Sequence, residues 1–326
     1  MSLMIFRPVR WAFVALRIII LFALCCLPSV SIAEEQIVSE VVQSLPLPNR
    51  LLLPISPTLD PLGRVLIIDG SNGAIWVIDP EKSQPSQTFL ASGQASPVLE
   101  NPTKIFADWG LHVYTLDPSL QRISVFDLQG RFETSFDLEA ALTEAAHSSD
   151  VEFTDLVVDK TGSLAVLDRL EGRVFIFDPN GKLNRVLGED FTGDERLIAP
   201  TNLEIDPVGN LYVADPPSGR VLQIGRQGSL LRIWKLRDEE HPQSRPTELA
   251  YSSGVLWVAD PGERRMLALF PGKVDSESRQ LKMLRFEWLD RTSLELAGIA
   301  DGRLLVLDSR GRRLHLISDP YSQTGR

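Results

Sequence analysis

Short apolar runs that end in aspartate recur along this chain at nearly even spacing. Each run is rich in Val, Ile and Leu and has the length of a short buried strand. Successive terminal aspartates lie 48, 51, 47, 45 and 48 residues apart, and they are Asp69, Asp117, Asp168, Asp215, Asp260 and Asp308. A period in this range, carried by strand-like segments, predicts a radial array of small antiparallel sheets.

Each repeat holds three further strand-like segments around that run. The first often opens on Pro-Thr, and a third and a weaker fourth segment follow the aspartate, for example 122–127 and 131–138. The turn between the first two segments contains a glycine in every repeat: Gly63, Gly110, Gly162, Gly209, Gly254 and Gly302. Because four antiparallel strands make one blade, six repeats predict an all-β fold, a six-bladed β-propeller.

The two ends of the repeat array complement each other. The sixth repeat stops at Asp319-Pro320 after its third strand-like segment, so its fourth strand is missing. The segment 37–45 is rich in β-branched residues and belongs to no repeat. We expect it to complete the last blade and close the ring, which removes an exposed sheet edge.

The repeat resembles a known family. The segment 200–221 (PTNLEIDPVGNLYVADPPSGRV) is similar to NHL repeats, and the likeness extends over the chain from about residue 52. That resemblance implies a six-bladed propeller. It implies little about activity, because NHL-type propellers include protein-binding and RNA-binding modules as well as lyases and lactonase-like enzymes.

The first 33 residues have the pattern of a secretory signal peptide. Arg7, Arg10 and Arg17 precede an apolar stretch at 18–27, and small residues occupy the cleavage-site positions at 31 and 33. A membrane anchor is less consistent with this stretch, because ten apolar residues span only about half of a bilayer core. We therefore expect residues 1–33 to be cleaved, residues 34–320 to form one propeller, and residues 321–326 to be a tail.

Cleavage would leave no cysteine and no disulfide, since both cysteines lie in the leader. It would also leave 30 basic and 43 acidic residues, a net charge of −13. Such a charge argues against nucleic acid as the partner. These features favour a periplasmic or secreted protein of a bacterial cell envelope, without a stable membrane anchor after cleavage.

Candidate metal ligands come from the third residue of each repeat. This position holds Ser56, Lys104, Asp155, Asn202, Glu248 and Leu296, which we expect near the mouth of the central channel. Asp155, Asn202 and Glu248 offer oxygen ligands from three successive blades, and hard cations prefer such ligands. Lactonase-like six-bladed propellers are similar in holding a divalent ion at this end of the channel. By this resemblance, the ion in this chain would be a cation such as Ca or Zn. The basic side chain of Lys104 beside the three residues speaks against such an ion.

The remaining periodic residues are better explained by structure. Terminal aspartates accept backbone N–H groups in loops. The arginines that open the third strands are expected to form blade-to-blade ion pairs or rim charges: Arg122, Arg173, Arg220, Arg265 and Arg313. The four histidines have no metal-ligand spacing.

Two functions remain open from the sequence. The first is a non-enzymatic, exported propeller that binds a protein partner through its loop-rich, acidic face, where the inter-blade loops such as 139–152 gather. The loop 139–152 has helical composition, with Asp137 as its expected N-cap. The alternative is a periplasmic metal-dependent hydrolase or lactonase-like enzyme that works around the candidate cation site.

Overall fold

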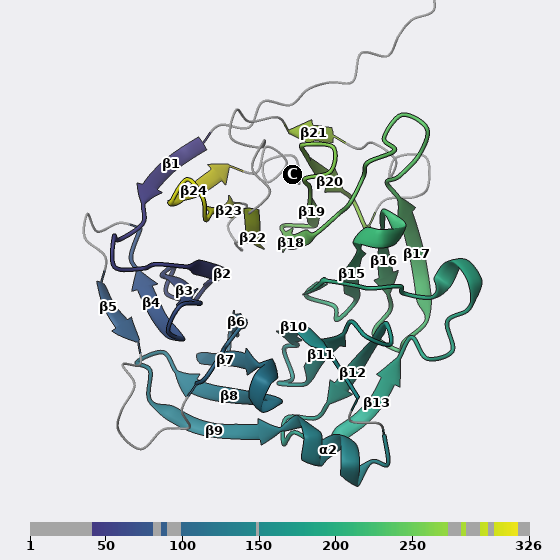
Figure 1. The fold of residues 1–326 in the computed structure, drawn as a ribbon, viewed down its shortest axis with the longest axis horizontal. Helices are drawn as coiled ribbons and strands as arrows, with labels where there is room; N and C mark the ends of the chain where they lie inside the picture. The colour runs from purple at the N-terminus through teal and green to yellow at the C-terminus, as the bar shows by residue number, and fades with distance from the viewer. Residues whose placement is uncertain are drawn as a thin grey trace, which may run out of the picture. The chain divides into compact units, whose positions relative to one another are not determined.

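Six small antiparallel sheets form a ring (Figure 1). A computed structural model describes residues 41–80, 86–89, 99–147, 150–272, 282–284, 294–298 and 303–318. In these residues 24 strands make six four-stranded sheets. The predicted all-β, six-bladed propeller is therefore confirmed, whereas the leader 1–33 and the tail 321–326 lie outside the described residues.

Five blades follow the order of the chain, with the first strand of each at the centre of the ring. Blade 1 contains β2 (Pro54–Leu59), β3 (Val65–Asp69), β4 (Ala74–Ile78) and β5 (Ser86–Phe89). Blade 2 contains β6 (Lys104–Ala107), β7 (His112–Asp117), β8 (Arg122–Asp127) and β9 (Phe132–Asp137). Blade 3 contains β10 (Phe153–Val158), β11 (Leu164–Asp168), β12 (Arg173–Phe177) and β13 (Leu183–Leu187). Blade 4 contains β14 (Asn202–Ile205), β15 (Leu211–Asp215), β16 (Arg220–Ile224) and β17 (Leu230–Lys235). Blade 5 contains β18 (Glu248–Ser252), β19 (Val255–Asp260), β20 (Arg265–Leu269) and β21 (Lys282–Leu284).

The sixth blade joins the two ends of the propeller. It contains β22 (Leu294–Gly298), β23 (Arg303–Asp308) and β24 (Arg313–Ser318), and its fourth strand is β1 (Val41–Pro46). β1 pairs antiparallel with β24, with Leu45 opposite Leu314. The predicted closure of the ring by the segment 37–45 is thus confirmed over its described part.

Short helices occupy some of the loops. The helix α2 (Leu138–Glu144) follows β9, and the Asp137 side chain accepts a hydrogen bond from the Ala140 N–H at 2.9 Å, which confirms the predicted N-cap. Three single 3-10 turns occur at η1 (Pro118–Leu120), η2 (Gly193–Glu195) and η3 (Pro216–Ser218).

The hydrophobic core is divided among the seams between blades. In β3, Leu66 and Ile68 pack toward blade 2, whereas Val65 and Ile67 pack toward blade 6. This two-sided burial explains why the aspartate-terminated runs are continuously apolar, because successive side chains of a strand point to opposite faces and both faces are covered.

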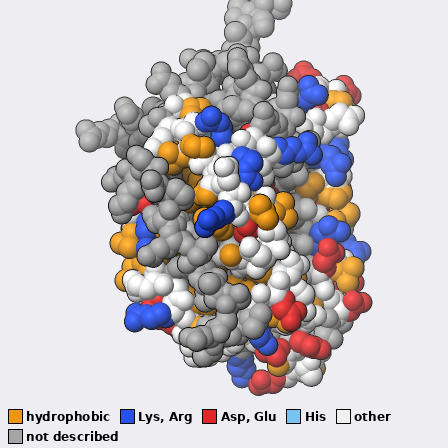
Figure 2. Space-filling model, turned by 60° about the vertical axis from the view of Figure 1, so that its left-hand side comes forward, with side chains coloured by type: hydrophobic (Ala, Val, Ile, Leu, Met, Phe, Trp, Pro, Cys, Tyr) orange, Lys and Arg blue, Asp and Glu red, His pale blue; other side chains and the backbone are white. Residues whose placement is uncertain are grey.

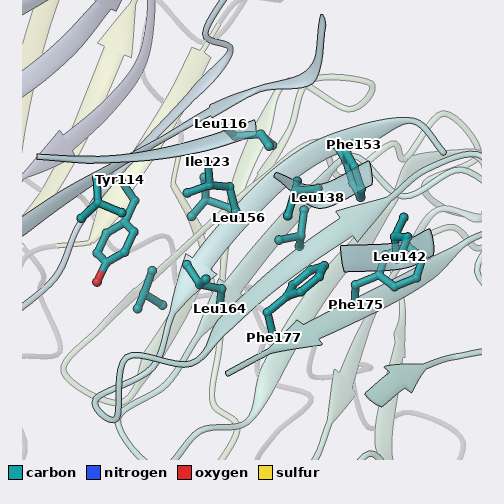
Figure 3. Close-up of a cluster of buried hydrophobic side chains, with 13 residues drawn as sticks. Tyr114, Leu116, Ile123, Leu138, Leu142, Phe153, Leu156, Leu164, Phe175 and Phe177 are labelled. Carbon is teal, nitrogen blue, oxygen red and sulfur yellow. The ribbon is translucent and has the colours of Figure 1, made fainter. Parts of the chain in front are cut away.

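The seam between blades 2 and 3 shows how this packing works (Figure 3). Leu116 and Ile123 of blade 2 meet Leu156 and Phe175 of blade 3. Leu142 of α2 joins the same buried cluster, so the helix covers the outer end of this seam. Each blade is therefore fixed by its neighbours, which sets the positions of the first strands around the channel.

Candidate binding site at the central channel

The periodic aspartates hold the inter-blade loops. The Asp69 carboxylate accepts hydrogen bonds from the N–H groups of Leu52 and Leu53, both at 3.0 Å, and from Ser71 in the next turn. Asp117 makes the equivalent contacts in blade 2 with Glu100 and Asn101. The structural interpretation of these residues holds, and their carboxylates do not form a ring of free ligands.

The arginines that open the third strands pair within their own blade. Arg173 Nε lies 2.9 Å from Asp168 Oδ2, and Arg265 Nε lies 2.9 Å from Asp260 Oδ2. Arg220 pairs with Asp215 in the same way. The expectation of blade-to-blade ion pairs is corrected for these three arginines. The reason is register, because each arginine lies directly opposite its aspartate across a hairpin.

The predicted metal ligands come together at the start of the first strands. Asn202 Nδ2 donates to Asp155 Oδ2 at 2.8 Å and to Glu248 Oε2 at 3.2 Å. Lys104 Nζ lies 3.6 Å from Asp155 Oδ2 and 4.0 Å from Glu248 Oε2. These four side chains therefore form one group. Together with Glu295 and Ser56, whose contacts follow below, we call it the Lys104 cluster.

The sixth position of the ring is Glu295, which corrects the assignment of Leu296. Glu295 pairs with Leu307 in the sheet and accepts a hydrogen bond from the Ser56 N–H, whereas Leu296 is buried in the core between blades 5 and 6. Neighbouring strand residues point to opposite faces, so an alignment error of one residue exchanges a channel acid for a core leucine. The Ser56 hydroxyl in turn accepts from the Ile105 N–H at 2.9 Å.

Charge in the Lys104 cluster is unbalanced. Burial alone disfavours the Lys104 ammonium, but the carboxylates of Asp155, Glu248 and Glu295 outweigh burial and raise the pKa of Lys104 above its ordinary value. Burial raises the pKa values of the three acids, to about 8 for Glu248, while the ammonium opposes that rise. One ammonium thus faces three carboxyl groups.

A fourth acid of the channel, Glu204, is half-buried and lies two residues after Asn202 on β14. Glu204 accepts from the N–H groups of Ile205 at 2.8 Å and Tyr251 at 3.2 Å. Burial raises its pKa to about 8. Sequence reasoning missed Glu204, although it lies two residues after Asn202 and so faces the same side of β14.

The channel widens into a cavity of about 1220 Å³. Its described lining includes the Lys104 cluster and the turns that follow the first strands, but no residue of the inter-blade loops. The cavity therefore opens at the face that carries these turns, which we call the turn face, and it ends at the Lys104 cluster. The cluster lies at the inner end of this cavity, at the start of the first strands, and the cavity mouth is on the opposite face from the loop-rich one.

Several turns at this face carry exposed apolar side chains. Trp109 is 75% exposed and Val208 64% exposed, and both line the cavity. Leu62 and Leu111, on the same kind of turn in blades 1 and 2, are 63% and 53% exposed. No sequence signal marked these four residues, because single exposed apolar residues are common in loops.

The turn of blade 2 departs from the other turns at this face. The described turns of blades 1, 3, 4 and 5 have a glycine in the left-handed region, at Gly63, Gly162, Gly209 and Gly254, with φ between 76° and 92°. In blade 2 the equivalent residue is Leu111, with φ 70°. The glycine of this turn, Gly110, lies one residue earlier, and a Cβ there would lie 3.0 Å from Asp108 Oδ2.

Polar groups of blade 2 lie beside this turn. His112 Nδ1 is 3.2 Å from Asp108 Oδ2, and His112 Nε2 is 3.5 Å from Glu133 Oε2. The Tyr114 hydroxyl donates to Asp108 Oδ2 at 3.2 Å. These contacts fix the base from which Trp109 projects.

On the side drawn in Figure 2, the described acidic, basic and hydrophobic side chains are intermixed. By contrast, nine acidic and three Lys or Arg residues line the described part of the cavity. The acidic cavity is thus the more distinctive electrostatic feature.

A divalent metal does not fit the donor set of the Lys104 cluster. Asn202 directs its N–H groups toward the carboxylates, and its Oδ1 already accepts from the Leu249 N–H at 2.9 Å. Within the described ranges, no three His, Cys, Asp or Glu residues are grouped so that they could hold a metal ion. The described residues also include no helix that is long and apolar enough to cross a membrane.

Comparison with solved structures supports the fold. The chain is similar to virginiamycin B lyase from Staphylococcus aureus, with a TM-score of 0.58 and 12% identity over 85% of this chain and 98% of that chain. It is also similar to the PQQ-bound aldose sugar dehydrogenase of Streptomyces coelicolor, with a TM-score of 0.56 and 13% identity over 86% and 97% of the two chains. A chain from a nidogen/laminin complex matches with a TM-score of 0.55 and 19% identity over 76% and 84%.

Sequence comparison adds no narrower family. No protein-family profile matches the chain, and no curated protein matches it in sequence. At these identities the likenesses show the fold alone, and the NHL resemblance stays a prediction. The chain is a six-bladed β-propeller whose structural neighbours include enzymes and a chain of a nidogen/laminin complex.

Proposed function

We propose that this chain is an exported, non-enzymatic propeller that binds a protein segment at its turn face. The observation that carries the proposal is the turn of blade 2, which exposes Trp109 at the mouth of the acidic cavity. The segment would place an apolar side chain against Trp109 and a basic side chain in the cavity. Protein-binding propellers among the structural neighbours are consistent with this function.

Trp109 has the properties of a binding hot spot. Tryptophan is enriched among the few interface residues that contribute most of the binding free energy. Leu62, Leu111 and Val208 add exposed apolar side chains on turns of the same face, from blades 1, 2 and 4.

The backbone of Leu111 supports the same interpretation. A leucine in the left-handed region costs about 1 kcal/mol relative to a glycine-compatible turn. The equivalent turns of blades 1, 3 and 4 avoid this cost with glycine. A strained residue that exposes its apolar side chain beside Trp109 is better explained by binding than by stability.

Charge complementarity defines the second feature of the partner. The described cavity lining is acidic, with nine acidic and three Lys or Arg residues. A lysine or arginine of the partner segment would be attracted to this field. A nucleic acid or an acidic segment would be repelled.

An enzymatic function receives less support from the site. The alternative is a metal-dependent hydrolase that works around Asp155, Asn202 and Glu248, and it requires a cation between their oxygens. The Lys104 amine lies beside these oxygens, and the Asn202 amide presents its nitrogen. Enzymes among the structural neighbours do not decide the matter, because one fold supports many functions.

Export is the part of the proposal that depends on sequence alone. The arginine-rich start, the apolar stretch 18–27 and the small residues before position 34 support cleavage and release into the periplasm or the medium. Fractionation of cells that produce the full chain, compared with a chain that starts at Glu34, tests this. Retention of both chains in the cytoplasm would contradict export.

Peptide display on the immobilised protein tests the binding function. We expect selected peptides to be enriched in Lys or Arg next to an aromatic or aliphatic residue. Trp109→Ala should weaken their binding about 30-fold or more, the effect of losing a hot spot worth about 2 kcal/mol. Ile198→Ala removes an exposed apolar side chain from an inter-blade loop and serves as the matched control.

Two results would contradict the proposed function. One is a selected peptide set without basic residues. The other is binding that survives Trp109→Ala but is lost in Ile198→Ala, which would move the site to the loop-rich face.

A further inference from the structure

The Lys104 cluster has a cation of its own. From the sequence, Asp155, Asn202 and Glu248 were candidate ligands for a divalent ion at this end of the channel. We propose that Lys104 is the resident cation of this chain, a covalently attached counter-ion that takes the role of such a metal. This role is separate from the proposed binding at the turn face.

The geometry of the carboxylates supports an ammonium rather than a metal. Asp155 Oδ2 and Glu248 Oε2 lie 3.6 and 4.0 Å from Lys104 Nζ, and both oxygens also accept from the Asn202 amide nitrogen. Calcium requires oxygens at about 2.3–2.6 Å on all sides. The Asn202 oxygen cannot supply one of them, because the Leu249 N–H holds it.

The number of charges supports the same assignment. Asp155 is buried, and an isolated carboxylate in that environment would be strongly destabilised. It receives two backbone N–H groups, from Leu156 and Leu203, in addition to the Asn202 amide. Lys104 supplies the only basic side chain that the structure describes in contact with it. A buried acid is therefore satisfied entirely by groups of the chain.

The ammonium also joins parts of the ring that are far apart. Lys104 comes from blade 2, whereas its two carboxylate partners come from blades 3 and 5. Neighbouring blades are also linked by hydrogen bonds. Asn202 of blade 4 donates to acids of blades 3 and 5. Ser56 of blade 1 donates its N–H to blade 6 and accepts at its hydroxyl from blade 2. Lys104 adds a link across the channel, which closes the inner end of the cavity.

The proposal predicts that metals act only after Lys104 is removed. The melting temperature of the wild-type protein should be the same in chelator and in millimolar Ca²⁺, Mn²⁺ or Zn²⁺. Lys104→Met should lower it by several degrees, and Ca²⁺ or Mn²⁺ should restore part of the loss, because binding to the folded state stabilises by mass action. Lys235→Met removes an exposed lysine paired with Asp194 and should change neither value.

The double variant Lys104→Met/Glu248→Gln separates charge from packing. Removing one carboxylate together with the ammonium should recover stability relative to Lys104→Met alone, without metal. A role of Lys104 in packing alone predicts no recovery. That result would overturn the proposal.

A second measurement does not depend on the folding of a variant. Acylation of the native, full-length protein, followed by mass spectrometry, compares Lys104 with Lys235. We expect Lys104 to be modified at least ten-fold more slowly, and Asp155→Asn to increase its rate while that of Lys235 stays the same. Equal acylation rates of Lys104 and Lys235 in the wild-type protein would overturn the proposal. So would a rise in the wild-type melting temperature on adding metal, if Asp155→Asn abolishes that rise.

Discussion

Leu111 lies in a backbone conformation that glycine adopts without strain. Leu111→Gly should therefore stabilise the propeller by roughly 0.5–1 kcal/mol, since relief of the left-handed strain is partly offset by the greater freedom of glycine in the unfolded chain. The same change should weaken peptide binding, because it removes an apolar side chain beside Trp109. Urea unfolding and peptide titration on one variant measure both effects.

Gly63 provides the reverse control. Its φ is 76°, and a Cβ at this position would meet no atom within 4 Å. Gly63→Leu should therefore destabilise the protein by about 1 kcal/mol through backbone conformation alone. If Leu111→Gly were destabilising while Gly63→Leu was neutral, the strain argument would fail.

Glu204 should make stability depend on pH. Its pKa is about 8 in the folded protein, against an ordinary value of 4.5. Between these values the folded state binds more protons than the unfolded state, so the free energy of unfolding falls as pH rises, by at most about 1.4 kcal/mol per pH unit. Glu204→Gln should reduce this decline, measured by urea unfolding from about pH 5 to about pH 8.

The wild-type protein, measured over the same pH range, is the reference for this pH dependence. An unchanged slope in Glu204→Gln would show that Glu204 is ionised with an ordinary pKa.

The residues of the site were only partly predictable from the sequence. The repeat brings Asp155, Asn202 and Glu248 to equivalent positions, so their proximity follows from the period alone. The sixth repeat matches the others poorly, so its alignment was uncertain by one residue. From the sequence, Leu296 was therefore assigned to the position where the structure has Glu295. The contacts of Lys104 across the channel depend on side-chain direction, which no repeat alignment contains.

At the scale of strands and hairpins, the aspartate that ends the second strand of a blade and the arginine that begins the third stabilise each other as an ion pair. Asp260 accepts from the Ser244 hydroxyl at 2.8 Å and the Arg245 N–H at 2.7 Å, and it pairs with the buried Arg265. Asp260→Asn leaves Arg265 without its anion and should destabilise the fold by about 3–5 kcal/mol. Chemical unfolding monitored by circular dichroism measures the loss.

Asp178→Asn tests whether any turn aspartate would have the same effect. Its carboxylate accepts from the N–H groups of Asn180 and Lys182 in an exposed turn. We expect a much smaller loss than in Asp260→Asn, because water can replace these contacts. Equal losses in both variants would mean that the buried arginine adds nothing.

Strands and turns were predictable because their signals are local. The runs that end in aspartate correspond to β3, β7, β11, β15, β19 and β23. The positive φ of Leu111 rather than Gly110 was not predictable, because both residues lie in one short turn and glycine is normally the residue with positive φ. The arginine pairs were assigned to the wrong partner because cross-strand register is not visible in a single repeat.

At the scale of the whole propeller, β1 holds the ring closed. It gives β24 its outer partner (Figure 1), and the Leu47 N–H extends the contact to the Arg312 carbonyl at 2.9 Å. Leu47 and Leu51 are then buried between blades 6 and 1. The first and last parts of the propeller therefore depend on each other, and an open ring would expose the edge of β24.

Removal of β1 tests this dependence. A chain that starts at Leu47 should melt at a lower temperature than a chain that starts at Glu34, and it should aggregate through the exposed edge of β24. Because strand pairing can form between separate chains, a peptide of residues 37–46 added in excess should raise the melting temperature again. A scrambled peptide of the same composition is the control. If the chain that starts at Leu47 is as stable as the longer one, or if both peptides act equally, β1 does not stabilise the ring. The seams between blades alone would then hold the closed channel and its inner Lys104 cluster.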